Sequence, residues 1–376
     1  MQRLLLGPGP SEVHPRVLAA LGRPTIGHLD PLFLEQLDQV QAALRRVFRT
    51  ENRITLPISG TGSAGMEACL ANLLEDGDEV VVGVNGVFGI RMADVATRLG
   101  AKVVPAEATW GTAVSADAVR QALARCVKPR VVAIVHAETS TGVWQPVPEI
   151  VKLAHDSGAL VVLDTVTSLG GCPVDIEAWG IDAAYSGTQK CLSCPPGLSP
   201  LTFSERALRQ VTKRKGKPRS WYFDLSLIGD YFGSSRVYHH TAPINMIYAI
   251  HEALRMVLEE GLEARFARHH ANHRALIAGL AVLDIHPTVA ESERLSMLNS
   301  VAVPDGVDDG YIRGRLLGRR IEIGGGLGPL AGKIWRIGLM GESSRIENVR
   351  RLLACLAIEL RSARANQAID AADQCA

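Results

Sequence analysis

The regular alternation of short apolar runs with helical segments between Arg53 and Ser186 is the feature that most constrains the fold. Runs rich in valine and isoleucine, such as RVVAIVHAE and LVVLD, alternate with helical segments such as SAGMEACLANLLE and EIVKLAHDSG. Strands that are apolar along their whole length are typical of parallel sheets covered by helices on both faces. The sequence therefore predicts an α/β fold with a doubly wound, largely parallel sheet.

A change of pattern near Gly261 indicates a second domain. A long amphipathic segment from about residue 245 to 260 ends at this glycine, a residue that commonly follows a helix. A helix rich in His and Arg, mixed strands and a final helix come after it. We expect an N-terminal segment (1–15) packed near the active site, a large domain (16–261) and a smaller α/β domain (262–376), with the last dozen residues frayed.

The composition narrows the class of partner. The chain has 376 residues and a net charge of +1, which provides no general field for attracting nucleic acid or an anionic membrane. No stretch approaches the ~20 apolar residues of a membrane span. The seven cysteines are scattered and odd in number, which favours reduced thiols over a disulfide framework. We expect a cytoplasmic protein that acts on small molecules.

Two residues indicate a specific cofactor. Asp164 ends the apolar run LVVLD, and Lys190 follows the next predicted strand in SGTQK. Pyridoxal phosphate requires such a pair, because a lysine amine forms a Schiff base with its aldehyde and a carboxylate keeps its pyridine nitrogen protonated. Taken alone, the two residues could also be a loop cap and a surface lysine.

A glycine-rich loop predicts a phosphate site. GTGSAG, from Gly60 to Gly65, has the G-x-G-x-x-G spacing of dinucleotide-binding folds. The acidic residues nearby precede the following strand, whereas NAD binding requires one at its end. Thr61, Gly62 and Ser63 would instead present amides and hydroxyls at a helix N-terminus, where a single terminal phosphate is favoured.

Arg336 lies in the otherwise apolar run IWRIGLMG. A buried guanidinium needs an anionic partner, and its fork matches a carboxylate with two hydrogen bonds. We expect Arg336 to bind the substrate carboxylate, and the alternative is an ion pair with an acidic residue of the protein.

Three patterns favour structural interpretations. The basic and aromatic segment KRKGKPRSWYF is typical of a solvated loop leading into buried aromatics, and a nucleic-acid site is the alternative. His269 and His273 have a spacing that could share zinc, but an exposed helix face is favoured. Cys191 and Cys194 form a C-x-x-C with no second pair to complete a zinc site. No metal is therefore expected.

Several longer segments, in order and spacing, carry a family resemblance. They are GPGPSEV, SGTGS, HAETSTGVWQP, DTVTSLGG, YSGTQKCLSCPPG, VYHHTAP and GGLGPLAGKIWRIGLMG. Together they resemble the class V aminotransferases of the fold-type I pyridoxal phosphate enzymes, most closely the alanine–glyoxylate and serine–glyoxylate types. The resemblance covers nearly the whole chain and implies a large domain with a mostly parallel, seven-stranded sheet and a smaller C-terminal α/β domain.

The resemblance also implies roles for single residues around the cofactor. Lys190 would be the Schiff-base lysine and proton shuttle, and Asp164 would contact the pyridine nitrogen. The phosphate would be bound by Thr61, Gly62, Ser63 and Gln189. Phe88 would stack on the ring, although relatives often carry Trp there, and Ser63 stands where several carry His. Both replacements keep the chemistry, since Phe can stack and Ser can donate.

Further implied residues concern the substrate and a second subunit. Arg336 would bind the substrate carboxylate, Thr139 would contact cofactor and substrate, and the backbone of Gly9 would line the pocket. Tyr238 and Thr241 match residues that reach the phosphate of the neighbouring subunit. The resemblance therefore implies a homodimer with shared active sites.

The expected activity is transfer of the amino group of alanine or serine to glyoxylate, giving pyruvate or hydroxypyruvate and glycine. A transaminase for another small donor, such as ureidoglycine or an aminophosphonate, is an alternative. A lyase or desulfurase on the same scaffold would need a reactive thiol near the substrate. A non-catalytic cofactor-binding protein would have no need of the Lys190, Asp164 and Arg336 set.

Overall fold

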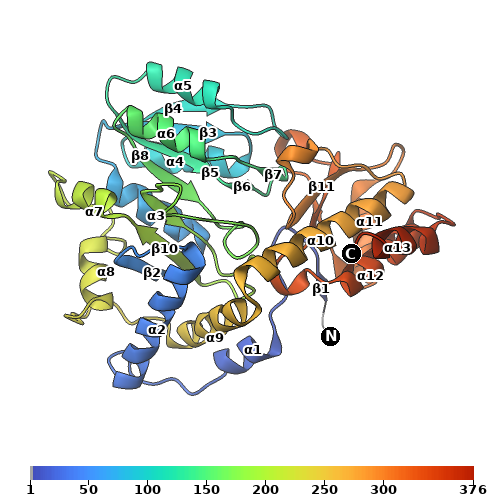
Figure 1. Ribbon diagram of the computed structural model, residues 1–376, viewed down its shortest axis with the longest axis horizontal. Coiled ribbons are helices and arrows are strands. Elements are labelled where there is room, and N and C mark those ends of the chain that lie inside the picture. The colour runs from blue at the N-terminus through green and yellow to red at the C-terminus, as the bar shows by residue number, and fades with distance from the viewer. Residues whose placement is uncertain (1–2) are drawn as a thin grey trace.

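The computed structural model describes residues 3–376, so the first two residues of the predicted N-terminal segment lie outside the described part. Two α/β units lie side by side, and the long helix α10 (Leu262–Val282) extends from α9 (Ile244–Glu260) into the smaller one (Figure 1). Gly261 joins these helices with a positive φ of 83°, a conformation that glycine adopts without strain. The predicted helix end at Gly261 is confirmed.

The large unit is built on a seven-stranded sheet with the order β2-β10-β9-β8-β5-β3-β4. Its strands are β2 (Ile54–Ser59), β3 (Glu79–Val84), β4 (Lys102–Glu107), β5 (Pro129–Val135), β8 (Leu160–Asp164), β9 (Ala183–Tyr185) and β10 (Leu198–Phe203). Only β10 runs antiparallel to its two neighbours, which confirms the prediction of a mostly parallel sheet. The sequence pattern did not indicate β10, because Ser199, Pro200 and Thr202 interrupt its apolar run.

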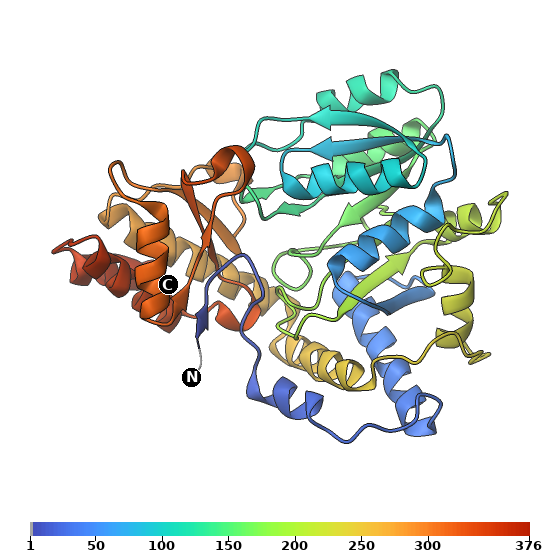
Figure 2. The same ribbon diagram turned by 180° about the vertical axis from the view of Figure 1, so that it is seen from behind.

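Helices cover both faces of this sheet. The chain passes from β2 through β3 to β4 in one direction across the sheet, and right-handed crossovers place α3 (Gly62–Leu73) and α4 (Val87–Arg98) on the same face. It then returns through β5 to β8, which places α5 (Ala116–Ala124) and α6 (Pro148–Asp156) on the other face (Figure 2). The strand side chains form the core between these layers.

The remaining elements of the large unit surround this sandwich. They are α1 (Pro15–Leu21), α2 (Pro31–Phe48), the hairpin β6 (Ala137–Glu138) and β7 (Val143–Trp144), α7 (Glu205–Thr212) and α8 (Leu225–Phe232). Helices α2, α7 and α8 begin where Asp30, Ser204 and Asp224 accept hydrogen bonds from first-turn amides. These are residues that satisfy helix N-termini well.

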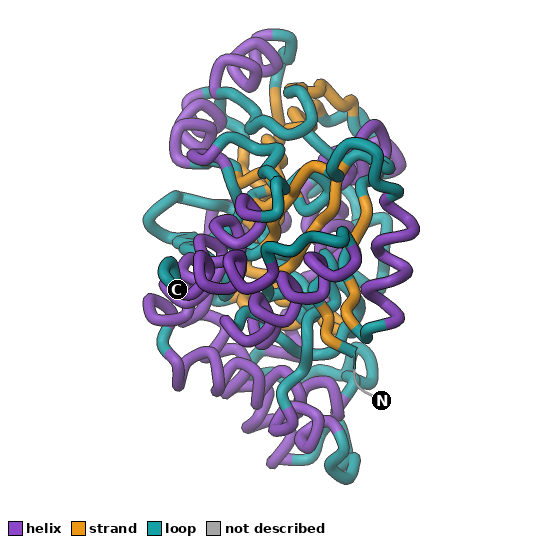
Figure 3. Tube along the Cα trace, turned by 90° about the vertical axis from the view of Figure 1, so that its right-hand side faces the viewer, coloured by secondary structure: helices purple, strands orange, loops and turns teal. Residues whose placement is uncertain are grey.

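The small unit packs helices on a three-stranded antiparallel sheet of order β11-β14-β13 (Figure 3). Besides α10 it contains β11 (Leu298–Ala302), α11 (Asp309–Gly318), β12 (Ile321–Glu322), β13 (Gly324–Gly325), β14 (Ile334–Gly338), α12 (Ile346–Glu359) and α13 (Ala365–Asp373). The N-terminal strand β1 (Leu4–Leu5) pairs with β12, and Leu4 and Leu6 are buried in the core of the small unit. Residues 4–6 are thus part of the small unit.

Three predictions about local structure were wrong. The last dozen residues are not frayed, because residues 365–373 form α13, which buries Ala368 and Ala372. His269 and His273 do not form an exposed face. Both are buried, since His269 accepts a hydrogen bond from the Gly341 amide and His273 pairs with Asn299.

The third wrong prediction concerns the basic segment KRKGKPRSWYF, which was expected to lead into buried aromatics. Its first aromatic residue is Trp221, whose side chain is 63% exposed. Within residues 3–376 no three His, Cys, Asp or Glu side chains are grouped as a metal site. In the same range, no helix combines the length and the hydropathy needed to cross a bilayer.

Candidate active site

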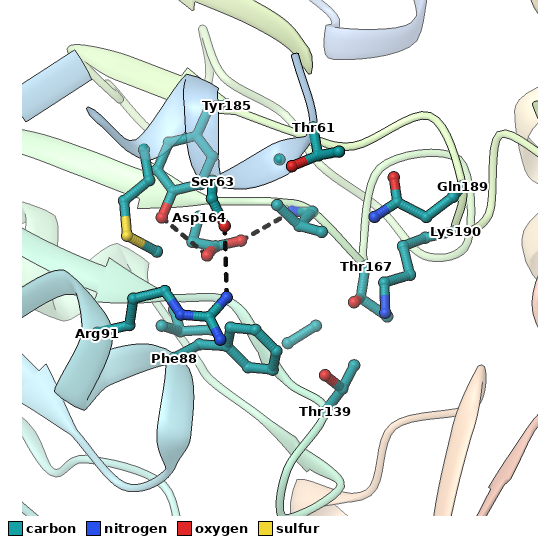
Figure 4. A pocket seen from close by; sticks show the side chains of 15 residues that line it. Thr61, Ser63, Phe88, Arg91, Thr139, Asp164, Thr167, Tyr185, Gln189 and Lys190 are labelled. Atoms are coloured by element: carbon teal, nitrogen blue, oxygen red, sulfur yellow. Dashed lines mark hydrogen bonds between the residues drawn. The ribbon is translucent and has the colours of Figure 1, made fainter. Parts of the chain in front are cut away.

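A cavity of about 140 Å³ opens at the carboxyl edge of the large sheet, close to the small unit (Figure 4). Such edges are where ligands bind in open α/β sheets. The structure brings together most of the predicted site residues as its lining: Thr61, Gly62, Ser63, Phe88, Thr139, Asp164, Gln189 and Lys190. Seven lining residues were not predicted: Met66, Arg91, Val135, Ala137, Val166, Thr167 and Tyr185.

One end of the cavity is formed by the N-terminus of α3. Its N-cap residue Thr61 makes no side-chain hydrogen bond to the helix, so no side chain caps the first turn. Thr61 and Ser63 line the cavity there, and Ser63 Oγ accepts a hydrogen bond from Arg91. Gly62 is required here because a Cβ at this position would lie 2.8 Å from Val166 Cγ2. An uncapped helix N-terminus of this kind favours an anion.

Gln189 adds an unsatisfied polar group to the lining. Its Oε1 is buried and has no hydrogen-bond partner among the described residues. Buried polar atoms are normally paired. A ligand in the cavity would supply the missing donor.

Asp164 forms the floor of the cavity at the end of β8. Its Oδ1 accepts a hydrogen bond from the Val166 amide and its Oδ2 accepts one from the Tyr185 hydroxyl, each at 2.8 Å. Burial raises the pKa of Asp164 to about 6, although both hydrogen bonds oppose the rise. A cationic partner in the cavity would stabilise the ionised form.

Lys190 reaches the cavity from the loop after β9. Burial lowers the pKa of its amine to about 8, and the cation Arg336 adds to this effect. The amine donates a hydrogen bond to the Pro8 carbonyl. A lysine with such a pKa loses its proton more readily than an ordinary lysine, which suits it to attack a carbonyl and to move protons.

The N-terminal segment closes the cavity over Lys190. A Cβ at Gly9 would lie 2.6 Å from Lys190 Nζ, so only glycine fits at this position. Ser11 Oγ donates to the Lys190 carbonyl at 2.7 Å, and the Ser11 amide donates to the Gln189 carbonyl at 2.8 Å. These contacts bring the segment from β1 to α1 against the lysine loop.

Phe88 and Arg91 form the opposite wall, one turn apart on α4. The Arg91 guanidinium lies 4.9 Å from the centre of the Phe88 ring and donates to Ser63 Oγ at 3.3 Å. Figure 4 shows the Arg91 guanidinium between the Phe88 ring and Ser63 of the glycine-rich loop. Arg91 follows Phe88 by three residues on α4, so both side chains lie on one helix face, but this spacing alone did not indicate a role for Arg91.

Arg336 approaches from β14 of the small unit. Its Nε donates to the Gly325 carbonyl at 2.7 Å and its Nη1 donates to the Thr139 carbonyl at 3.2 Å. It is buried, yet no carboxylate of the described residues lies within ion-pair distance. The alternative of an ion pair with an acidic residue is therefore wrong for the described chain, and the guanidinium is available for an anionic ligand.

Tyr238 and Thr241 are not brought to the cavity of their own chain. The Tyr238 hydroxyl lies 3.4 Å from Thr241 Oγ1, and the Tyr238 side chain is 56% exposed. Within one chain they have no part in the site.

Two of the residues that were not predicted bear on the chemistry, and one of them, Glu138, does not line the cavity itself. Tyr185, on β9, donates to Asp164, and Glu138, in the quoted segment HAETSTG, is fully buried next to the cavity. A tyrosine ending a strand beside the strand that ends in Asp164 gave a usable signal, since neighbouring parallel strands end at one edge. Glu138 gave none, because only the fold shows that it is buried.

Comparison with known proteins decides the family. The profile described as Aminotransferase class-V matches residues 11–328. The chain belongs to this family. An alanine–glyoxylate aminotransferase of Nostoc sp. is 49% identical, with a TM-score of 0.94 over 96% of each chain. The ureidoglycine–glyoxylate aminotransferase of Bacillus subtilis is 41% identical, with a TM-score of 0.96 over 100% of this chain and 98% of the other. The alanine–glyoxylate aminotransferase of Drosophila melanogaster is 40% identical, over 96% of this chain and 93% of its own.

Membership confirms the predicted fold type and the expectation of an aminotransferase that uses pyridoxal phosphate. The residues present fit this cofactor. The uncapped α3 N-terminus suits its phosphate and Asp164 suits its pyridine nitrogen. The lowered pKa of Lys190 makes the neutral amine that its aldehyde requires easier to form.

Proposed function

We propose that the protein transfers the amino group of alanine or serine to glyoxylate. The observation that carries the proposal is the buried Arg336, which lies without a carboxylate partner among the described residues and contacts the cavity residue Thr139. A guanidinium in this setting selects an α-carboxylate, which both amino donor and oxo-acid acceptor possess. The alanine–glyoxylate relatives support the choice of substrates.

The chemistry is divided among three residues. When bound, pyridoxal phosphate supplies an aldehyde for the amino group and a ring that withdraws electrons from the substrate α-carbon. Lys190, with its lowered pKa, takes the α-proton and returns it in the transfer. Asp164 holds a proton at the pyridine nitrogen, and Arg336 orients the carboxylate.

A second candidate donor is ureidoglycine. The Bacillus subtilis relative named for this activity has a TM-score of 0.96, against 0.94 for the alanine–glyoxylate aminotransferase of Nostoc sp.. Arg336 suits the carboxylate of either donor and does not separate them. Glyoxylate is the acceptor in both cases.

The desulfurase alternative has less support. No described residue that lines the cavity is a cysteine. Burial raises the pKa of the neighbouring Cys191 to about 11 and also raises the pKa of Cys194, so neither thiol is poised as a nucleophile.

A donor panel tests the proposal. Purified protein loaded with pyridoxal phosphate is given glyoxylate with alanine, serine, ureidoglycine or cysteine, and glycine and the new oxo acid are quantified. We expect equimolar glycine and pyruvate or hydroxypyruvate from alanine or serine. Turnover of ureidoglycine alone would select the second candidate, and sulfide from cysteine without glycine would contradict both.

Replacing Arg336 by glutamine is expected to raise the KM of both the amino donor and glyoxylate by about 10- to 100-fold, the usual contribution of a hydrogen bond to a charged group. The effect should be similar for the two substrates, because both present a carboxylate to one guanidinium. Steady-state kinetics measure it. The matched control is Arg98→Gln, whose side chain is 76% exposed on α4. A normal KM for both substrates in Arg336→Gln would refute the assignment.

We also propose that two chains share their active sites, with Tyr238 and Thr241 reaching the phosphate of the partner's cofactor. Their exposure supports this, and so do the exposed apolar side chains of Leu29, Leu32 and Val237. A cytoplasmic location stays a prediction from the sequence.

Mixing two inactive variants tests the shared sites. Lys190→Ala and Tyr238→Ala chains, unfolded and refolded together, should regain up to about a quarter of wild-type activity if subunits pair at random in closed dimers. A hybrid dimer would contain one site with both native residues. Full activity of Tyr238→Ala alone, or no recovery in a mixture shown by mass to contain the hybrid, would contradict shared sites.

A further inference from the structure

Glu138 is the one fully buried acidic side chain beside the cavity, within the described residues, to which no role has been given. It ends β6, directly before Thr139, and its relative exposure is 0%. A carboxylate in such a place is costly unless it is fully hydrogen-bonded. Its partners therefore indicate its purpose.

The carboxylate of Glu138 lies at the N-terminus of α4. Its Oε2 accepts hydrogen bonds from the Phe88 amide at 3.1 Å and the Gly89 amide at 3.3 Å. These donors belong to the first turn of the helix, where a negative charge is stabilised by the helix dipole. The same interaction fixes the backbone of Phe88, whose ring forms the cavity wall.

Ser140 completes the network. It donates its amide, at 3.1 Å, and its hydroxyl, at 2.5 Å, to Glu138 Oε1, and its Oγ accepts from the Val87 amide at 2.9 Å. A Cβ at Gly86 would lie 2.5 Å from Glu138 Cδ, so only glycine leaves room for the carboxylate at the helix start. Burial raises the pKa of Glu138, and the hydrogen bonds from Ser140, Gly89 and Phe88 oppose this rise.

The backbone that follows Glu138 contacts the small unit. The next residue along the chain, Thr139, lines the cavity and accepts a hydrogen bond from Arg336 through its carbonyl. Glu138 also acts on Arg336 through its charge, which raises the pKa of the guanidinium against the lowering effect of burial. Phe88 on α4 is thus joined to Arg336 on β14 through two consecutive residues. The Phe88 amide donates to the Glu138 side chain, and Arg336 donates to the carbonyl of the next residue, Thr139.

From this geometry we propose that Glu138 is a positioning residue that aligns the ring-stacking wall at Phe88 with the carboxylate-binding group Arg336. The proposal deepens the function proposed above and rests on it. Glu138 itself does not line the cavity, so it acts through the two residues that it aligns.

Glu138→Gln is the test variant, because it keeps the shape of the side chain while one acceptor oxygen becomes a donor. Either the pair Phe88 and Gly89 or Ser140 then loses its acceptor. We expect the affinity of the apoprotein for pyridoxal phosphate to fall about tenfold and the KM of the amino donor to rise about tenfold, as for loss of a charged hydrogen bond. The matched control is Glu149→Gln on α6, whose side chain is 71% exposed.

Two readouts separate positioning from a general loss of structure. Amide hydrogen exchange of the cofactor-free protein should accelerate at residues 86–90 in Glu138→Gln and stay unchanged in α3. The double variant with Arg336→Gln should show a KM no higher than Arg336→Gln alone, because the effect on KM passes through Arg336. Additive effects in this cycle, or a Glu138→Gln protein equal to the control in exchange, cofactor affinity and KM, would overturn the proposal.

Ser140→Ala serves if Glu138→Gln does not fold, since it removes one donor and leaves the acid in place. Smaller changes in the same directions are expected, and unchanged exchange at residues 86–90 would count against the network. Failure of the proposed function is distinguishable, because it would appear as a wild-type protein that binds pyridoxal phosphate but forms no glycine in the donor panel. In that case the exchange and affinity measurements would still decide whether Glu138 anchors Phe88.

Discussion

Lys190→Ala is expected to lower turnover by about 10⁴-fold, because the variant loses both the nucleophilic amine and the proton shuttle. Among the residues that the structure describes around the cavity, none offers a second amine. The other cations near the cavity are the guanidinium groups of Arg91 and Arg336, which do not give up protons at ordinary pH. The covalent link between protein and cofactor should be lost at the same time.

The measurement combines kinetics with borohydride treatment. Wild-type protein should retain the reduced cofactor after denaturation, and Lys190→Ala should release all of it. Lys152→Ala is the matched control, since this lysine is 76% exposed on α6 and should behave as wild type. A small primary amine added to Lys190→Ala should restore part of the proton transfer. Full activity of Lys190→Ala without added amine would disprove the assignment of the lysine.

The sequence was sufficient for the parts of the site that depend on local pattern. Asp164 ends an apolar strand and Gly62 begins a helix, as the local pattern predicted, and both line the cavity at the carboxyl edge of the sheet. The same reasoning identified Arg336, because a charged residue inside an apolar strand needs an explanation. The glycine-rich loop was assigned to a phosphate, and not to NAD, because no acidic residue ends the strand that follows it.

The missed residues depend on contacts between segments far apart in the chain. Glu138 and Arg91 are ordinary charged residues in the sequence, and only the packing of α4 against the β6 turn gives them a place beside the cavity. The pairing of β1 with β12 was also hidden, since two leucines give no period from which a strand can be predicted. His269 and His273 were misplaced because hydrogen bonds to Gly341 and Asn299 allow their burial.

Asp164→Asn is expected to reduce turnover by about 10²- to 10³-fold, the usual cost of removing one electrostatic contact to a reacting system. An amide accepts a hydrogen bond but supplies no charge, so the pyridine nitrogen would be protonated less and the ring would withdraw electrons less strongly. Cofactor attachment to Lys190 should persist. Loss of turnover with retained attachment distinguishes this variant from Lys190→Ala.

The same substitution should stabilise the cofactor-free protein above pH 6. Burial raises the pKa of Asp164 from its ordinary value of 3.8 to about 6 in the folded chain. Since the folded state binds this proton more tightly than the unfolded state, the stabilisation is complete below about pH 4 and is lost as pH rises through about 6. The side-chain amide of the variant would carry no charge to bury.

The difference in free energy of unfolding between Asp164→Asn and wild type should therefore grow from pH 4 to pH 7 and reach ~1–3 kcal/mol. Urea unfolding of both apoproteins across this range measures it, with the exposed Asp370→Asn as control. Pyridoxal phosphate should remove the advantage, because the wild-type carboxylate then faces a cationic nitrogen. A difference that does not change with pH in the apoproteins would mean that burial does not destabilise the ionised carboxylate of Asp164. The argument that this carboxylate needs the cationic ring nitrogen as its partner would then fail.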